Sequence, residues 1–178
     1  VGAIRLPDAI TTNIDQFTGR TWLLAPLLDW YEKSNERIFL LTGGPGSGKS
    51  MVMAWLAGEG PAPGNRLDAE RLTKLRNAVS AIHFCQATSR NNSPLAFADA
   101  MAHQLTANVP SFSDALASTM AGRVQIHVSQ RVDIASEGAS ITGVSIDRLD
   151  MGSLGDEQAF DLTLSRPLKA LYASGHTQ

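Results

Sequence analysis

The sequence predicts a three-layer α/β fold, in which a sheet of parallel strands lies between two layers of helices and carries a small antiparallel hairpin insertion. Two apolar runs of strand length, residues 37–42 and 78–87, are each followed by a segment with helical patterning. Strands that alternate with helices along a chain form parallel sheets covered by those helices. Residues 123–149 instead alternate apolar and polar side chains, which is typical of half-exposed antiparallel strands.

The composition is that of one globular domain and excludes several classes of protein. The 178 residues are 43% hydrophobic, which is enough for a core. The net charge of −2 gives no electrostatic footprint for nucleic acid, and no run of about 18 apolar residues predicts a membrane span. The N-terminus lacks the pattern of a secretory signal, and the single cysteine, Cys85, excludes an internal disulfide. We therefore expect a cytoplasmic protein without nucleic-acid or membrane partners.

Residues 1–16 are mixed in character and predict a segment that leads into the domain, which we expect to span residues 17–178. A helix is expected to begin near Thr21, a residue type that caps helices. Pro26 lies in its first turns and predicts a late start or a kink. The apolar side chains of this helix fall largely on one face. They are Trp22, Leu23, Leu27, Leu28, Trp30 and Tyr31.

The most specific motif is the run Gly43-Gly44-Pro45-Gly46-Ser47-Gly48-Lys49-Ser50. It fits G-x-x-x-x-G-K-[ST], the phosphate-binding loop known as Walker A, at every fixed position. The context also fits, because residues 37–42 predict a buried strand before it and residues 50–57 predict a helix after it. The alternative is a glycine-rich surface turn in which Lys and Ser follow by chance.

Each residue type in this loop has a chemical reason. Glycines let backbone N–H groups turn toward a polyphosphate without clashes from Cβ atoms, and the N-terminus of the next helix adds partial positive charge. Lys49 can reach the β- and γ-phosphates, and the Ser50 hydroxyl can ligate Mg²⁺. The loop therefore predicts a nucleotide-binding protein.

The segments after this helix complete the predicted layers. Residues 68–77 predict a short, exposed, charged helix. The second strand would bury Ile82, Phe84 and Cys85, and a buried thiol of this kind packs as a small apolar side chain. Residues 94–107 carry apolar side chains at helical spacing and predict a helix that packs on the sheet.

The C-terminal third predicts the hairpin and one more helix. Residues 137–140 have the composition of a hairpin connection within the insertion 123–149. Residues 156–173 predict a helix with Phe160, Leu164, Leu168 and Leu171 inward. Pro167 predicts a kink or a new helix start within it.

Several stretches resemble one family. FTGR…LLDWYEKSNERIFLLTGGPGSGKSMVMAWL and AIHFCQATSRNNSPLAFADAMAHQL resemble the start of a NACHT/STAND-type signalling ATPase, a branch of the AAA+-like P-loop superfamily. VSQRVDIASEGASITGVSIDRL and AFDLTLSRPLKAL are similar to the next segments of bacterial and fungal members. The resemblance covers nearly the whole chain. It implies a three-layer P-loop NTPase sheet, of which this chain holds the N-terminal part.

The resemblance implies an ATP/ADP-binding switch module that binds Mg²⁺-nucleotide within a multidomain signal-transduction ATPase. Effector and sensor domains would flank it in the same chain. In such proteins Lys49 corresponds to the catalytic lysine and Ser50 to the Mg²⁺ ligand. The nucleotide contacts that it implies in the loop are Gly43, Gly44, Pro45, Gly46, Ser47, Gly48, Lys49, Ser50 and Met51.

The resemblance also implies an adenine-side motif upstream of the loop. Its residues in this sequence are Phe17, Gly19 and Arg20. Packing of Phe17 in the core is an equally good alternative. Arg20 belongs to the same motif, so the resemblance places it beside the base.

Hydrolysis requires an acidic residue at a strand end, which the family carries in a Walker B strand after the helix that would end here at Ala173. The sequence shows no such strand before Gln178, so we expect an incomplete sheet whose exposed apolar surface favours self-association. Asp147 follows an apolar run and is an internal candidate for this acid, but Ser145 interrupts the run.

Four interpretations of the function remain open at this point. The chain is an ATPase switch module, a nucleotide-binding fragment that does not hydrolyse ATP, an oligomerisation fragment that works by contacts, or, ranked lower, a small-molecule kinase. All but the oligomerisation fragment depend on the loop binding a polyphosphate.

Overall fold

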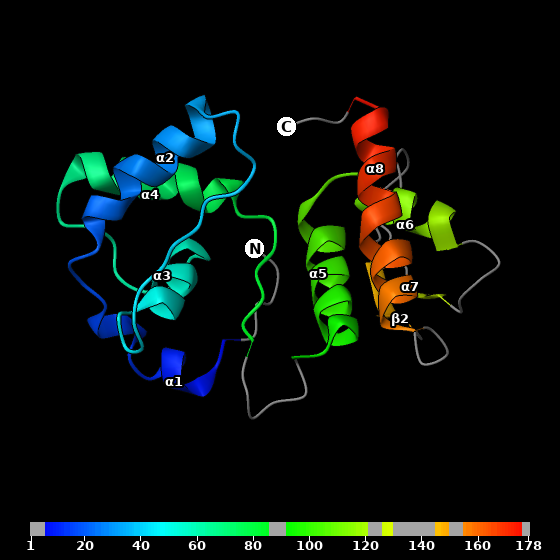
Figure 1. The fold of residues 1–178 in the computed structure, drawn as a ribbon, viewed down its shortest axis with the longest axis horizontal. Coiled ribbons are helices and arrows are strands. Elements are labelled where there is room, and N and C mark those ends of the chain that lie inside the picture. The colour runs from blue at the N-terminus through cyan, green and yellow to red at the C-terminus, as the bar shows by residue number, and fades with distance from the viewer. Residues whose placement is uncertain (1–5, 86–91, 121–125, 130–144, 150–154, 176–178) are drawn as a thin grey trace, which may run out of the picture. The chain divides into compact units, whose positions relative to one another are not determined.

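The computed structural model describes residues 6–85, 92–120, 126–129, 145–149 and 155–175. The chain divides into two compact units, Ala3–Phe84 and Cys85–Gln178 (Figure 1). Each unit has buried side chains of its own. Among the described residues, no helix has both the length and the apolar character needed to cross a membrane.

The first unit is built from short helices. Within residues 6–84, two 3₁₀ turns and four α-helices follow one another, and an irregular segment and the glycine-rich loop lie between α2 and α3. Pro26 lies in the first turn of α2, so this helix begins late, after the 3₁₀ turn, as that proline predicts. The elements are α1 (Asp8–Thr11), η1 (Ile14–Gln16), η2 (Thr21–Leu23), α2 (Leu24–Lys33), α3 (Lys49–Leu56) and α4 (Arg66–Ala78).

The core of this unit joins α2, α3 and α4. Its buried side chains are all apolar, and helix α2 packs against α4. A second, smaller cluster of Ile10, Ile14 and Ala54 connects α1 and η1 to α3. Asn65 caps the N-terminus of α4, because its side-chain oxygen accepts a hydrogen bond of 2.9 Å from the N–H of Asp68. The main cluster comprises Leu23, Leu24, Val52, Trp55, Leu56, Leu72 and Leu75.

The predicted apolar face of the helix after Thr21 is correct only in part. Leu23 is buried, and Leu27 and Leu28 pack against the main cluster. Trp22 lies in the 3₁₀ turn and Tyr31 near the end of α2, and both side chains are exposed. Thr21 lies inside that turn and does not cap α2.

The prediction of a three-layer α/β sheet is wrong for the part of the chain that the structure describes. Residues 38–44 and 79–85, which include most of both predicted strands, have no regular secondary structure. In the first run, Phe39 and Leu41 pack against the helical core, while Ile38 and Leu40 remain about 80% exposed. The apolar side chains of the run are thus partly buried by helices, and no described strand pairs with it.

Residues 79–85 of the second predicted strand are likewise irregular, and their apolar side chains are also partly buried by helices. Ile82 is buried, and Phe84 packs against the Ile10, Ile14 and Ala54 cluster. Cys85 is exposed, so its predicted place in the core is also wrong. A short apolar run has no periodicity that distinguishes a strand from other buried backbone, which is why the pattern misled here.

The described residues of the second unit are also mainly helical, and they include one pair of antiparallel strands. Ser93 caps α5 by accepting a 3.1 Å hydrogen bond from the N–H of Ala96, and Pro94 occupies the first turn. Helix α6 packs against α8, and α5 packs against α7 and β2. The elements are α5 (Pro94–Asn108), α6 (Phe112–Met120), β1 (Ile126–Ser129), β2 (Ser145–Leu149), α7 (Asp156–Phe160), η4 (Asp161–Ser165) and α8 (Arg166–Ala173).

The strands β1 and β2 lie within the residues 123–149 that predict an antiparallel hairpin. They pair antiparallel, with Ile126 opposite Leu149 and Ser129 opposite Ser145. A bulge at the step from His127 to Val128 leaves Asp147 without a paired residue. The expected connection at residues 137–140 lies outside the described residues.

The C-terminal helix passes through one wide turn. Residues Asp161–Ser165 form a π-helical turn, η4, between α7 and α8. Pro167 follows this turn and lies near the start of α8. A proline ring clashes with the carbonyl four residues earlier in a regular helix, and a π turn moves that carbonyl away. Buried Thr163 donates its hydroxyl to the Ala159 carbonyl at 2.8 Å.

We expect Leu72→Ala to lower the unfolding free energy of the first unit by about 2–5 kcal/mol, because it removes a buried side chain from the main cluster. All three tryptophans, Trp22, Trp30 and Trp55, lie in this unit, so urea unfolding followed by tryptophan fluorescence reports on it. Leu67→Ala on the same helix is the control, since Leu67 is 57% exposed. Equal losses in both variants would contradict the described core.

Candidate functional site

The loop Gly43–Ser50 has a backbone that only glycine adopts readily at two of its positions. Gly46 and Gly48 have positive φ angles of 74° and 86°. The N–H of Ser47 donates to the Gly44 carbonyl at 3.3 Å and closes the turn. A Cβ atom at Gly43 would lie 2.8 Å from the Ser47 Oγ, so this glycine permits a close approach. Local geometry thus explains Gly43, Gly46 and Gly48, whereas Gly44 has no positive φ and a Cβ there would meet no atom within 4 Å.

Helix α3 begins directly after Gly48 and provides free backbone donors. The N–H of Val52 donates to the Gly48 carbonyl at 2.9 Å, which is the first helical hydrogen bond. The N–H groups of Lys49, Ser50 and Met51 precede it and have no hydrogen-bond partner among the described residues. These groups carry the partial positive charge of the helix N-terminus, which favours anions.

The Lys49 side chain lies across the loop. Its Nζ donates to the carbonyls of Gly43 at 2.7 Å and Gly44 at 2.9 Å, and lies 3.3 Å from the Ser47 Oγ. Within the described residues, no carboxylate forms an ion pair with this ammonium group. Its positive charge is therefore held at the loop by neutral oxygen atoms.

The upstream motif lies next to the loop. The Arg20 Nη2 donates to the Ser47 carbonyl at 3.4 Å. The Phe17 Cε2 lies 3.7 Å from the position that a Cβ at Gly48 would occupy. Gly19 between them has a positive φ of 75°, which lets the chain turn here. Two segments almost thirty residues apart in the sequence thus meet at one place.

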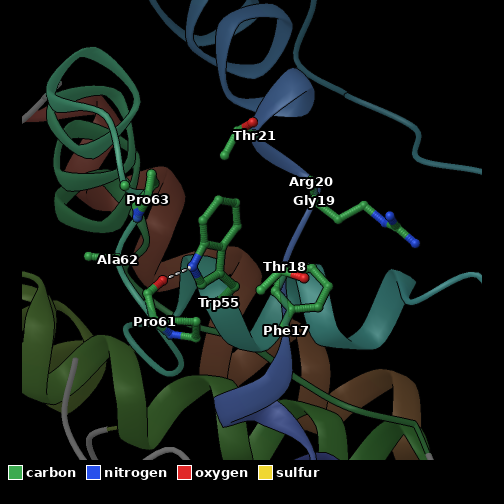
Figure 2. Close-up of a pocket in the computed structure, with 10 residues that line it drawn as sticks. Phe17, Thr18, Gly19, Arg20, Thr21, Trp55, Pro61, Ala62 and Pro63 are labelled. Atoms are coloured by element: carbon green, nitrogen blue, oxygen red, sulfur yellow. Dashed lines mark hydrogen bonds between the residues drawn. The ribbon is translucent and has the colours of Figure 1, made fainter.

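An apolar pocket of about 150 Å³ adjoins this meeting point (Figure 2). Phe17 and Trp55 meet edge to face in its wall, with ring centroids 5.6 Å apart. The Trp55 indole N–H donates to the Pro61 carbonyl at 2.7 Å, so the ring is held against the opposite side of the pocket. The lining residues are Phe17, Thr18, Gly19, Arg20, Thr21, Trp55, Pro61, Ala62, Pro63 and Gly64.

Arg76 of α4 does not line this pocket but binds the backbone next to it. Its guanidinium donates to the Trp55 carbonyl at 2.9 Å and to the Glu59 carbonyl at 2.8 Å, which satisfies the C-terminal end of α3. Burial lowers the pKa of Arg76 from its ordinary value, and the nearby charge of Glu59 raises it in part. Residues 59–65 have the composition of a loop, because they are rich in glycine and proline, but the sequence does not indicate their contact with Trp55.

The Ser50 hydroxyl is exposed at the N-terminus of α3 and has no hydrogen-bond partner in the described part of the chain. No group of three or more His, Cys, Asp or Glu side chains that could hold a metal ion occurs among the described residues. Asp147 is in β2 of the second unit, and its side chain lies outside the description.

We expect Gly48→Ala to destabilise the first unit by roughly 1–2 kcal/mol, because an alanine is strained at a φ of 86°. Urea unfolding monitored by tryptophan fluorescence measures the effect, since Trp55 lies on the same helix. Gly64→Ala is the control. Gly64 has no positive φ, and a Cβ there meets no atom within 4 Å. Unchanged stability of Gly48→Ala would contradict the left-handed helix cap.

Comparisons with known proteins point to one family. The family described as Nephrocystin 3, N-terminal matches residues 19–140, which is more than half of the chain and includes Arg20 and the whole loop. No curated protein and no solved structure gives a match. The likeness to NACHT/STAND ATPases rests on sequence segments alone and is separate from this match. The chain belongs to the nephrocystin 3 N-terminal family.

Proposed function

We propose that this chain is a nucleotide-binding switch module that holds the polyphosphate of ATP or ADP in the loop Gly43–Ser50. The observation that carries the proposal is the position of the Lys49 ammonium, 2.7 Å from the Gly43 carbonyl at the free N-terminus of α3. A lysine without a carboxylate partner, an unpaired helix N-terminus and a glycine-rich turn together form a site for an anion.

The hydrogen bonds of Lys49 explain how a phosphate would enter. Its present acceptors are two neutral carbonyls and a hydroxyl. A phosphate oxygen is anionic, so its bond to the ammonium group adds an attraction between opposite charges that a neutral carbonyl does not provide. The ammonium group would therefore bind phosphate oxygens more strongly than it binds the carbonyl oxygens. The N–H groups of Ser50 and Met51 would donate hydrogen bonds to other phosphate oxygens.

The pocket beside the loop is the place that we propose for the base of the nucleotide. Its walls are the aromatic rings of Phe17 and Trp55 and the proline-rich loop, and the indole N–H is already occupied by the Pro61 carbonyl. Such walls favour stacking with a flat base. Phe17 joins the two parts of the site, because it lines the pocket and lies next to Gly48. In this proposal it both packs in the unit and contacts the ligand.

Mg²⁺ fits this site only through the nucleotide. Ser50 offers one free hydroxyl, and Mg²⁺ commonly takes its other ligands from phosphates and water. When bound, the ion neutralises part of the phosphate charge. Hydrolysis also requires an acidic group to orient water, and no hydrogen bond or ion pair joins a described Asp or Glu to the loop. The proposal is therefore limited to binding.

A module of a larger protein is the setting that agrees with this proposal. The matching family is described as an N-terminal part of nephrocystin 3, which is consistent with flanking domains that would read the bound state. In the same setting, effector and sensor domains of one chain would be the partners. The location in the cytoplasm belongs to this proposal as well, because ATP and ADP are abundant there.

We expect Lys49→Ala to weaken binding of ATP and of inorganic tripolyphosphate by about 10- to 150-fold, the effect of losing a charged hydrogen bond. Isothermal titration calorimetry on the whole chain measures both affinities. Lys74→Ala is the matched control, because Lys74 only forms an exposed ion pair with Glu32 at 3.1 Å. If the wild-type chain binds neither ligand, or if Lys49→Ala binds both as tightly as wild type, the proposed function is wrong.

Ser50→Ala tests the place of the metal ion. We expect Mg²⁺ to increase the affinity of the wild-type chain for ATP, and this increase to fall by about tenfold in the variant, since one ligand of the ion is lost. Titrations with Mg²⁺ and with EDTA give the two affinities for each protein. In EDTA the variant should bind ATP with the same affinity as wild type. A Mg²⁺ effect of the same size in both proteins would contradict the role of Ser50.

A further inference from the structure

The side chain of Arg20 leaves the apolar pocket that its backbone helps to line. Figure 2 shows the guanidinium pointing away from Trp55, Pro61 and Pro63. Its hydrogen bond is made with the loop instead, from Nη2 to the Ser47 carbonyl at 3.4 Å. The same nitrogen lies 4.0 Å from the position that a Cβ at Gly48 would occupy. The geometry therefore associates Arg20 with the phosphate side of the site.

The bond to Ser47 has a consequence for the next N–H group. In a trans peptide the carbonyl of one residue and the N–H of the following residue point in opposite directions. A Ser47 carbonyl that faces Arg20 therefore directs the N–H of Gly48 to the other side of the loop. Lys49 has the same effect at Gly43, where its bond to the carbonyl directs the N–H of Gly44 away from the ammonium group.

The charge of Arg20 is not neutralised within the described residues. Arg66, Arg71 and Arg166 each form an ion pair with a carboxylate, at 2.7, 3.0 and 2.6 Å. No described carboxylate forms such a pair with Arg20, and none does so with Lys49. Two cations thus contact the carbonyls of one glycine-rich turn, from a segment upstream of it and from its own end.

We propose that Arg20 positions the phosphate loop and helps to bind the polyphosphate tail, rather than recognising the base. This inference rests on the proposed nucleotide-binding function and assigns one residue of the site to one part of the ligand. It predicts that the contribution of Arg20 is the same for a nucleotide and for the bare polyphosphate. A base-side role predicts a contribution to the nucleotide alone.

Calorimetry with ATP and with inorganic tripolyphosphate separates the two roles. We expect Arg20→Gln to weaken the binding of both ligands by the same factor, about 5- to 20-fold. This is the effect of losing one long hydrogen bond from a charged group. Arg20→Lys keeps the charge but loses the planar fork, so it should recover part of both affinities. The salt dependence of tripolyphosphate binding should also become weaker in Arg20→Gln, because one cation is removed.

Arg66→Gln is the control arginine. Its side chain is 92% exposed and pairs only with Glu70, so this variant should bind both ligands as wild type does. Urea unfolding of each variant, read by tryptophan fluorescence, establishes that the first unit is folded. Should Arg20→Gln not fold, Arg20→Lys carries the test, with an expected equal loss of about two- to fivefold for both ligands.

The inference is overturned if Arg20→Gln weakens ATP but leaves tripolyphosphate unchanged, or if it leaves both unchanged while Lys49→Ala weakens them. Those results reject the role of Arg20 and keep the proposed function. Failure of the wild-type chain to bind either ligand is a different result, and it rejects the proposed function together with the inference.

Discussion

The candidate site depends on the hydrogen bonds between the Lys49 ammonium group and the carbonyls of Gly43 and Gly44. Lys49 is the first residue of α3, and the same helix buries Val52, Trp55 and Leu56 in the core of the first unit. One short helix therefore joins the loop to the packed interior. The left-handed Gly48 sets where that helix begins, and thereby where the ammonium group and the free N–H groups lie.

The features that the sequence predicted well depend on neighbouring residues. The helices expected after the loop, at 68–77 and at 94–107 lie within one or two residues of α3, α4 and α5. The exposed character predicted for 68–77 is wrong, because Leu72 and Leu75 of α4 are buried in the main cluster. Local rules decide these elements. A positive φ requires glycine, a serine before Pro94 caps a helix, and apolar spacing selects the buried face. The loop can therefore be recognised from its residues alone.

The features that the sequence did not predict depend on contacts between distant segments. Whether the run 37–42 is a strand depends on a partner strand, and helices α2, α3 and α4 bury Phe39 and Leu41 without one. Likewise, the pocket exists because residues 17–21 and 61–64 meet at Trp55. No periodicity within either segment indicates that meeting. The sequence contains the aromatic residues, but it does not indicate that Phe17 and Trp55 meet in the wall of one pocket.

The guanidinium of Arg76 has a consequence for the shape of the pocket. It binds the carbonyl of Trp55 on one wall and the carbonyl of Glu59, two residues before the opposite wall begins at Pro61. The Arg76 side chain of α4 thus holds both walls by hydrogen bonds. A further hydrogen bond, from the Trp55 indole to the Pro61 carbonyl, joins the walls directly. The position of α4 therefore sets the distance between the two walls of the pocket, although no residue of α4 lines it.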